Sequence, residues 1–541
     1  MLPRPKSLLP ISWRAVLMGG SLPILALPVL LLGGGVAWGQ TASVGAKPLA
    51  APTSDKNASD KSAKADAAKP AATRTSAAKP NSTRPREPFK GNLASHLPTT
   101  LQDALAIAYA TNPTLLAERA KLRATDETVP QALAGWRPSV TVNVSPGYQS
   151  GVTSTVGNRN GVSYGIDAPY GRDTLVDSAL INQPIYTGGR TVASTNRAES
   201  QVQGERARLI ATEQQVFANV ITAYVNVIQN QQLVALNTSN VQVLERQLQA
   251  TNDRFRVGEI TQTDVAQAEA ALAGAQAVLQ TATGTLQSAR ATFRQYVGEL
   301  PGDLMPPQPV KLPAASQQAL VEIAASNNPN VVAAQFDDAA GKDAVDVAFS
   351  QLMPQVSVQG GYQKQYNTFE SNFAYGGPQV AVVLSMPLYQ GGSEYAAVRA
   401  AKQTEQQLRK TVDDQRRQAM QLAAQAWETY VAAKATIEST RSQIRANEIA
   451  LDGVQREALL GTRTTLDVLN AEQLLLNSRS TLIQNLASLI TASYSAVAAI
   501  GRLTAHDLAL PVAAYDETAY YNAVRNKWFG TGDHATDQPG R

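Results

Sequence analysis

The chain has 541 residues, contains no cysteine and carries a formal net charge of +4. The missing cysteine excludes disulfide bonds, thiolate metal sites and a lipid anchor attached to cysteine. The positive charge belongs to the first 95 residues, which carry +9, whereas residues 96–541 carry −5. The body of the chain is therefore acidic, and the sequence predicts no nucleic-acid partner.

The first residues are typical of an exported protein. Three basic residues precede an apolar stretch at 15–36, and the small residues Ala37 and Gly39 suit a cleavage site. We predict a signal peptide over 1–39. An uncleaved membrane anchor is the alternative, although prolines and glycines inside the stretch make a poor spanning helix. The basic residues are Arg4, Lys6 and Arg14.

Residues 40–96 contain almost nothing that a folded core could bury. Ala, Lys, Ser, Thr and Pro dominate this stretch, and such a composition predicts a disordered linker. The linker either serves as a solvated spacer or uses its lysines to touch peptidoglycan or an anionic lipid headgroup.

Beyond the linker the sequence repeats itself. The segment ALAIAYATNPTLLAERA at 104–120 corresponds to ALVEIAASNNPNVVAAQFD at 319–337, with an offset of 216 residues. From the second strand of each half onward the offset is 203, as between Pro184 and Pro387. One structural unit has thus been duplicated. The predicted parts are a first repeat at 97–300, a second repeat at 301–512 and a C-terminal tail at 513–541.

Each repeat is predicted to begin with two helices and to continue with two strands. Val356 and Val358 alternate with polar residues in the second repeat, as Val140, Val142 and Val144 do in the first. This period of two indicates strands with one apolar and one polar face. A loop rich in Gly, Tyr and Asn is expected to join the two strands of each repeat, which gives four strands per chain.

The second strand of each repeat runs into a motif that occurs twice, INQPIYTGGR at 181–190 and LSMPLYQGGS at 384–393. We call these segments the first and the second elbow. Proline has no N–H to donate and is expected to end strand pairing, and the glycines are expected to allow a sharp bend. Tyr186 and Tyr389 suit either a membrane interface or simple packing at the bend. The other elbow residues are Pro184, Gly188, Gly189, Pro387, Gly391 and Gly392.

A long proline-free stretch follows each elbow, at about 190–256 and about 393–460. Apolar residues recur every seven positions in both stretches, which predicts helices on the order of 100 Å long that pack like coiled coils. Each helix is followed by a turn that contains a glycine, Gly258 or Gly461, suited to a helix C-terminus. The Thr-x-x-Asp after each glycine is expected to cap the next helix.

Four amphipathic strands cannot close a membrane barrel within one chain, because open strand edges leave backbone groups without partners in hydrocarbon. The paired elbows, the paired Asn-Pro helices and GTRTTLDVLNAEQ at 461–473 resemble the TolC-like outer-membrane efflux and secretion channels, over about 97–512. The resemblance implies an α+β membrane protein. It also implies a homotrimer, in which a twelve-stranded β-barrel in outer-membrane lipid continues into a periplasmic α-helical barrel. The ending GRLTAHDLALPV resembles the type I secretion branch.

The resemblance also implies a periplasmic gate at the helix turns, which closes like an iris. Arg463 and Asp467 match the family's gate arginine and first aspartate, and Asp264 matches the acid of the other turn. Like charges brought together by symmetry can form a cation-sensitive constriction; alternatively, these acids only stabilise helix N-termini. The chain departs from the family pattern at Ala458, where an aromatic residue is usual, and at Asn470, where a second aspartate is usual.

Two kinds of protein partner follow from the resemblance. Gly258, Gly461 and Thr462 lie where the family contacts a periplasmic adaptor protein, with helix capping as their alternative role. An inner-membrane pump of the ABC, RND or MFS type is expected to supply the energy, because the chain has no Walker-type phosphate loop.

The predicted function is the outer-membrane exit duct of a tripartite export system, for secreted proteins or small toxic compounds, without cofactor or metal. An enzyme is not expected, because no histidine lies between 97 and 505 and no catalytic constellation is present. A periplasmic coiled-coil spacer or adaptor without a pore is the alternative. It would explain the heptads but not the repeated pair of amphipathic strands.

Overall fold

The computed structural model describes residues 97–532, so the predicted signal peptide, the linker and the last part of the tail lie outside the described residues. The first repeat contains α1 (Leu101–Thr111), α2 (Pro113–Asp126), α3 (Thr128–Leu133), the 3-10 helix η2 (Ala134–Trp136), β1 (Ser139–Arg159), β2 (Val162–Tyr186), α4 (Arg190–Arg256) and α5 (Gln262–Val297). The second contains α6 (Gln317–Asn327), α7 (Pro329–Phe349), η3 (Ser350–Leu352), β3 (Gln355–Tyr366), β4 (Ala374–Ser385), α8 (Ser393–Leu459) and α9 (Thr465–Ala499), and α10 (Ala519–Val524) follows.

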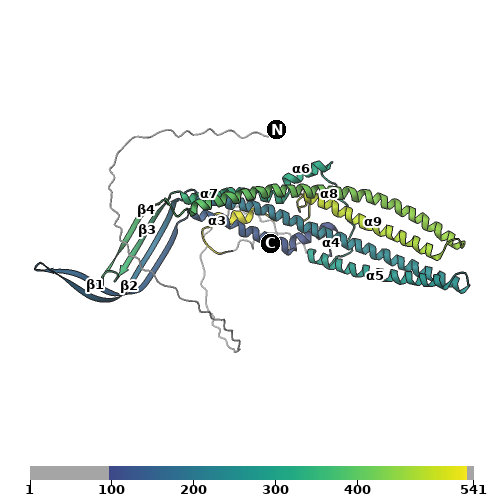
Figure 1. Cartoon of the computed structure of the whole chain (residues 1–541), viewed down its shortest axis with the longest axis horizontal. Coiled ribbons are helices and arrows are strands. Elements are labelled where there is room, and N and C mark those ends of the chain that lie inside the picture. The colour runs from purple at the N-terminus through teal and green to yellow at the C-terminus, as the bar shows by residue number, and fades with distance from the viewer. Residues whose placement is uncertain (1–96, 533–541) are drawn as a thin grey trace, which may run out of the picture. The chain divides into compact units, whose positions relative to one another are not determined.

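The two long helices confirm the predicted duplication. Helices α4 and α8 each have 67 residues, and both boundaries of α8 lie 203 positions after those of α4. Each packs against the helix that follows it, so that α4–α5 and α8–α9 form two hairpins, and α7 packs against both α4 and α8 (Figure 1). The predicted coiled-coil-like packing is present, because Ala275 of α5 is buried in one cluster with Val241 and Leu244 of α4.

The main hydrophobic core lies where α1, the middle of α4 and the end of α5 meet the chain after α9. Tyr224 and Phe217 of α4 and Phe293 of α5 are fully buried there, and the rings of Tyr224 and Phe293 are 6.2 Å apart. The Tyr224 hydroxyl donates to the Met305 backbone oxygen at 2.7 Å, so the one polar atom of this aromatic cluster is satisfied. The strands and the helix turns lie outside this core.

The four strands form one antiparallel sheet in the order β1-β2-β3-β4, as the sequence predicts. The prediction of a loop rich in Gly, Tyr and Asn between the first two strands is wrong. β1 and β2 continue as a regular hairpin from the pair Ser139–Asn182 to the pair Arg159–Val162. Asn160 and Gly161 both have positive φ, 57° and 84°. This two-residue turn matches the right-handed twist of the strands and lets pairing run to the tip.

Helix α9 and the tail helix α10 both pack against other helices of the protein. Among residues 97–532, α9 is the one helix whose length and composition would allow it to cross a membrane. It packs against α8, α4 and α5, as a helix in a bundle does. Helix α10 lies in the predicted tail and packs against α2, so residues 519–524 are part of the folded protein.

Candidate functional site

The sheet has one apolar and one polar face. The strand register places Val140 of β1, Ile181 of β2 and Val380 of β4 in one row on the same face. Both edge valines of this row are open, with 65% of Val140 and 80% of Val380 exposed. The neighbouring rows on this face also contain Val142, Val144, Val356, Val358, Val382 and Leu384, and in the Val144 row Asp177 pairs with Lys364. An apolar sheet face that no part of the described chain covers is suited to lipid.

The opposite face carries mostly small and uncharged polar side chains. In one row Thr141 of β1 pairs with Leu180 of β2, which in turn pairs with Gly361 of β3. Further positions on this face are Ser139, Asn143, Ser145, Asn182, Ser178, Ser357, Gln359, Gln363 and Gln379. Such a face can border water, and it presents no dense cluster of one charge that would trap a solute.

The first elbow is packed against the second repeat of the same chain. Gly188 has a φ of 67°, and a Cβ added there would lie 2.7 Å from the Met353 Cβ and 2.8 Å from the Ser350 backbone oxygen. Gly189, with a φ of 86°, is the N-cap residue of α4. Only glycine fits both the backbone conformation and the space at Gly188.

Pro184 does not end strand pairing, contrary to the prediction. It remains opposite Ser357, and β2 continues to Tyr186 beyond a register shift between Pro184 and Tyr186. The irregularity explains how the strand tolerates proline, since a bulge leaves a position where no ladder N–H is needed.

The second elbow has the same backbone but an open environment. Pro387 lies beyond the end of β4 at Ser385, as predicted, and Gly392 is the N-cap residue of α8 with a φ of 85°. Gly391 has a φ of 71°, and a Cβ added there would have no neighbour within 4 Å. The adjacent Leu388 and Tyr389 are strongly exposed.

The two helix turns are closed by identical caps. At the first, the Gly258 N–H donates to the Phe255 oxygen and the Glu259 N–H to the Arg254 oxygen, both at 3.0 Å. Gly461 and Thr462 repeat these bonds at the second turn, to Ala458 at 3.2 Å and to Glu457 at 3.0 Å. The glycines have φ values of 83° and 76°, so both turns are Schellman motifs.

The predicted gate acids take part in the caps of the following helices. The Thr261 hydroxyl donates to Asp264 at 2.7 Å, and the Thr464 hydroxyl donates to Asp467 at 2.8 Å. The backbone N–H of each threonine donates to the same aspartate oxygen at 3.0 Å. The structure therefore shows directly the helix-capping role that the sequence offered as an alternative.

Charge at the second turn is arranged around Arg463. Its Nε donates to the Glu457 carboxylate at 2.9 Å, and this carboxylate raises the pKa of Arg463. The hydrogen bonds from Thr464, aided by the charge of Arg463, lower the pKa of Asp467. Asn470 is exposed one turn further along α9, whereas Ala458 is buried.

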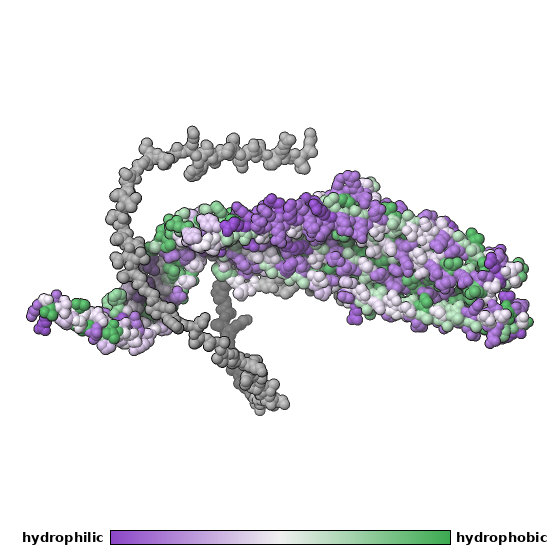
Figure 2. Space-filling model, in the orientation of Figure 1, coloured by the Kyte–Doolittle hydropathy of each residue, from purple (hydrophilic) through white to green (hydrophobic). Residues whose placement is uncertain are grey.

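The turns also expose apolar side chains that the sequence reading did not single out. Leu459 and Leu460 are 81% and 80% exposed, and Val257 at the other turn is exposed as well. Figure 2 shows hydrophobic surface at this end of the helices. The sequence could have indicated this exposure, because two leucines at a turn beside a helix-ending glycine have no hydrophobic core to pack against.

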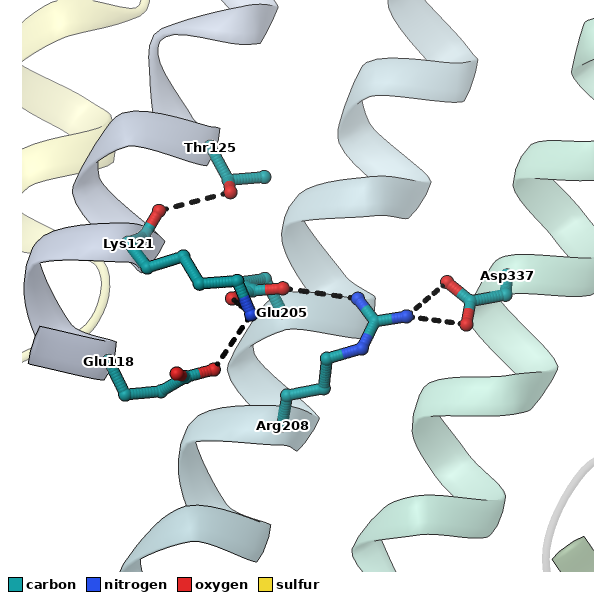
Figure 3. Close-up of polar contacts among 6 residues, drawn as sticks. All are labelled: Glu118, Lys121, Thr125, Glu205, Arg208 and Asp337. Atoms are coloured by element: carbon teal, nitrogen blue, oxygen red, sulfur yellow. Dashed lines mark hydrogen bonds and ion pairs between the residues drawn. The ribbon is translucent and has the colours of Figure 1, made fainter. Parts of the chain in front are cut away.

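An ion network joins α2, α4 and α7 between the elbows and the core (Figure 3). Arg208 of α4 contacts Asp337 of α7 at 2.5 Å and Glu205 at 3.1 Å, and Glu205 contacts Lys121 of α2 at 2.7 Å. Glu205 is buried; burial alone would raise its pKa, but Lys121 and Arg208 lower it. Lys121 and Asp337 occupy corresponding positions of the two repeats, 216 residues apart.

A groove of about 700 Å³ lies between α4, α8 and α9. Its lining contains glutamine, asparagine, serine, threonine and alanine, with Leu422 as the one large apolar residue and no charged residue. Among residues 97–532 there is also no cluster of three or more acidic or histidine side chains that could hold a metal ion. The surface of the helical part is thus polar and uncharged in this groove.

Strands with one lipid-compatible face, joined through elbows to helices of 67 residues, define the class of outer-membrane channel proteins. The sequence model described as outer membrane efflux protein matches residues 104–299 and 320–502. The chain belongs to the outer membrane efflux protein family, and it is an outer-membrane protein. This assignment favours a channel protein over both an enzyme and a periplasmic spacer without a pore.

Individual relatives agree with the family. The chain is 34% identical to the outer membrane efflux protein BepC of Brucella suis over 438 residues, which cover 80% of this chain and 92% of BepC. It is 26% identical to the outer membrane protein TolC of Vibrio cholerae over 414 residues, 73% of this chain and 89% of TolC.

The fold is that of solved outer-membrane channels. Crystal structures of CusC give a TM-score of 0.66 at 16% identity and cover 78% of this chain and 98% of CusC. The outer membrane protein VceC of Vibrio cholerae gives 0.62 at 20% identity, with 74% and 96% covered. At these identities the likeness concerns the fold alone.

Proposed function

We propose that three copies of this protein form one channel, which serves as the outer-membrane exit duct of a tripartite export system. The two-faced sheet with unpaired edges carries this proposal. β1 and β4 are the end strands of the sheet, and an outer-membrane protein cannot leave such edges in hydrocarbon. Pairing β4 of one copy with β1 of the next closes twelve strands, with the apolar face toward lipid and the polar face inside.

The duplication indicates which helical surfaces meet between copies. Within one chain, a Cβ added at Gly204 of α4 would lie 3.5 Å from the Phe336 Cβ of α7. The corresponding residues are Gln407 of α8 and Ala120 of α2, and both are exposed. If copies repeat the internal geometry, Gln407 of one copy faces Ala120 of the next.

Cysteine cross-linking tests this arrangement, because the chain has no cysteine of its own. The pair Ala120→Cys with Gln407→Cys should form disulfides between copies on mild oxidation, giving covalent trimers that reduction dissolves. The matched control is Gly204→Cys with Phe336→Cys, which should close within one chain. Failure of the first pair where the control pair closes would contradict the trimer.

We assign the periplasmic gate to the helix turns, at Asp264, Arg463, Asp467 and Asn470. Threefold symmetry would bring the Asp467 carboxylates of three copies toward one axis, where their mutual repulsion favours bound cations. Their low pKa keeps them ionised at neutral pH. The missing second acid at Asn470 makes the constriction less charged than in the family pattern.

Single-channel conductance tests the gate. A trivalent cation added on the periplasmic side should block the current, and Asp467→Ala should weaken the block by at least about tenfold, because the charge ring is lost. Asp264→Ala tests the proposed gate acid of the other turn in the same way. Block that does not change with Asp467→Ala would leave these acids with the capping role only.

We assign adaptor docking to the turn surface formed by Gly258, Gly461, Thr462 and the exposed Leu460. An open glycine next to an exposed leucine offers a shallow apolar surface without side-chain obstruction, suited to the end of a partner helix pair. The partner would be a periplasmic adaptor that connects to an inner-membrane pump of the ABC, RND or MFS type. This chain supplies no energy-coupling motif of its own.

Two substitutions separate docking from capping. Leu460→Asp removes the apolar contact but keeps the Gly461 cap, so export should be lost while trimers still assemble. Gly461→Asn keeps the left-handed conformation, and should preserve the fold. Export that survives Leu460→Asp would exclude this surface as the docking site.

A further inference from the structure

The C-terminal segment 515–529 is bound along the outside of the first repeat. The Tyr515 N–H donates to the Tyr109 hydroxyl at 3.1 Å, and the Tyr520 hydroxyl donates to Glu127 at 2.9 Å. Further along, Arg525 forms an ion pair with Glu199 of α4 at 2.9 Å. These contacts lead the segment from the core toward the base of the sheet.

The segment reaches Arg137, just before β1. Arg137 donates from Nη1 to the Lys527 backbone oxygen at 2.7 Å, and its guanidinium lies 5.1 Å from the centre of the Trp528 ring. β1 begins two residues later, at Ser139. In spite of these contacts Trp528 remains 64% exposed and Phe529 89% exposed.

Exposed Trp528 and Phe529 lie beside the start of the strands, where aromatic side chains suit a membrane interface. The apolar face of the sheet begins at Val140, directly after Arg137 and Ser139. Trp528 and Phe529 therefore lie where hydrocarbon gives way to headgroups if the strands cross the membrane. Lys527 is the neighbouring cation: its Nζ donates one hydrogen bond, to the Gly532 backbone oxygen at 2.9 Å, and has two further N–H groups that anionic phosphates would attract.

The second repeat has no counterpart of this structure. Met353 corresponds to Arg137, and it packs against Gly188 of the first elbow instead of holding a C-terminal segment. Aromatic residues are therefore added to the membrane boundary at one repeat only, by a segment that the duplication does not require.

We propose that Trp528 and Phe529 insert among the phospholipid headgroups of the periplasmic leaflet of the outer membrane, with Lys527 binding their phosphates. The C-terminal segment is then a lipid-bound strap that fixes the first repeat at the membrane boundary. This proposal rests on the membrane position of the strands proposed above.

Tryptophan fluorescence with brominated lipids tests the proposal in the assembled protein. Trp136→Phe with Trp427→Phe leaves Trp528 as the one tryptophan within 97–532. The protein is reconstituted in phosphatidylethanolamine–phosphatidylglycerol vesicles with acyl chains brominated close to the headgroup. The expected result is that bromination roughly halves the Trp528 emission, because heavy-atom quenching needs direct contact with the indole.

Two control variants, each with Trp528→Phe in the same background, calibrate the result. Val142→Trp on the apolar sheet face should be quenched, whereas Leu460→Trp at the far helix turn should not. Quenching of Val142→Trp without quenching of Trp528 overturns the lipid-bound strap and leaves the proposed channel intact. If neither is quenched, the membrane position of the strands is itself wrong.

Packing of Trp528 against another protein copy would give a different fluorescence result. Trp528 emission that is blue-shifted but unquenched, and that shifts to the red after Leu388→Ser with Tyr389→Ser, would mean that the ring packs on the second elbow of a neighbouring copy. That outcome also overturns the lipid proposal.

Discussion

The two elbows have the same sequence motif and the same left-handed glycines, yet their surroundings differ. Gly188 is enclosed by Ser350 and Met353 of the second repeat, whereas Gly391 has open space around it. The helices show the same contrast, since Gly204 of α4 faces α7 and the corresponding Gln407 of α8 is exposed. In the first repeat, the elbow and the long helix are covered by residues of the second repeat. The corresponding surfaces of the second repeat have no partner within the described chain.

This difference shows how a duplicated chain could assemble into the proposed trimer. Each contact between repeats is made once inside the chain and, in the proposed trimer, once between chains. The internal copy of the contact is therefore a direct guide to the geometry of the external copy. Variants at corresponding positions should accordingly affect folding in the first repeat and assembly in the second.

The largest contrast is expected at the elbow glycines. Gly188→Leu places a side chain against the Ser350 backbone and adds strain at a positive φ, so we expect no folded protein to reach the outer membrane. Gly391→Leu should leave the protomer folded and abolish the trimer. Heat-modifiable electrophoresis of outer membranes and limited proteolysis of the monomer distinguish the two defects.

Asparagine serves as the control at both elbows, because it accepts the left-handed conformation with little strain. Gly391→Asn should assemble more trimer than Gly391→Leu. Equal folding defects in Gly188→Leu and Gly391→Leu would contradict the idea that only one elbow is completed within the chain.

The second contrast concerns the ion network of Figure 3. Arg208→Met leaves the buried Glu205 with Lys121 as its remaining cation, and should cost about 2 kcal/mol, seen as a lower thermal unfolding midpoint in detergent. Thr411, the corresponding residue of α8, is exposed, so Thr411→Met should change stability by less than about 0.5 kcal/mol. A similar loss in both variants would argue against a network specific to the first repeat.

The third contrast is a pH dependence confined to the first repeat. Asp126 is buried on α2 near the C-terminal segment, and burial raises its pKa from 3.8 to about 7, against the nearby Arg206 and Arg123. The raised pKa means that the folded protein holds this proton, so the stabilisation is complete below pH 3.8 and is lost as the pH rises through about 7. Between pH 5.5 and pH 8 the loss is about 2 kcal/mol.

Asp126→Asn should remove that part of the pH dependence, measured as the difference in unfolding midpoint from the unaltered protein across this range. Glu213, whose pKa burial also raises, stays in both proteins and cancels in the comparison. The corresponding residue of the second repeat is the exposed Lys342, and Lys342→Gln should leave the pH profile unchanged. An unchanged profile in Asp126→Asn would exclude this carboxyl as its source.

The smallest effect is expected at the helix turns, where the two repeats have the same structure. Thr261→Ala and Thr464→Ala each remove an N-cap, which should cost about 1 kcal/mol and increase hydrogen exchange in the first turn of α5 or α9. Because the caps match, the two variants should agree closely in the isolated protomer. A larger effect of Thr464→Ala in the trimer would support a gate centred on Asp467.

The repeated architecture was predictable because its signals are local and periodic. The seven-residue pattern and the turn glycines defined α4 and α8 to within a residue or two, and the alternation at Val140 to Val144 identified a two-faced strand. The resemblance at 461–473 directed attention to the helix turns, but the sequence could not decide between gate and cap for Asp467. The structure shows the cap because Thr464 lies within its reach.

The features that the sequence did not predict depend on contacts between distant segments. Pro184 was predicted to end the strand, yet it pairs with Ser357 and β2 continues beyond it. No structure was predicted for the tail, although its Tyr515, Tyr520 and Trp528 contact Tyr109 of α1, Glu127 at the end of α2 and Arg137 before β1. An excess of aromatic residues in a C-terminal tail is the signal that could have indicated docking.

The hairpin of β1 and β2 is longer than that of β3 and β4, and β2 pairs with β3 only from Leu175 onward. Residues 147–174 therefore form a two-stranded ribbon that rests on no other strand. In the proposed orientation this ribbon is the part of the protein that the cell's surroundings meet. Its tip at Asn160 and Gly161 is accordingly where an epitope tag could be inserted, and where antibodies would reach the channel on living cells, without disturbing the wall.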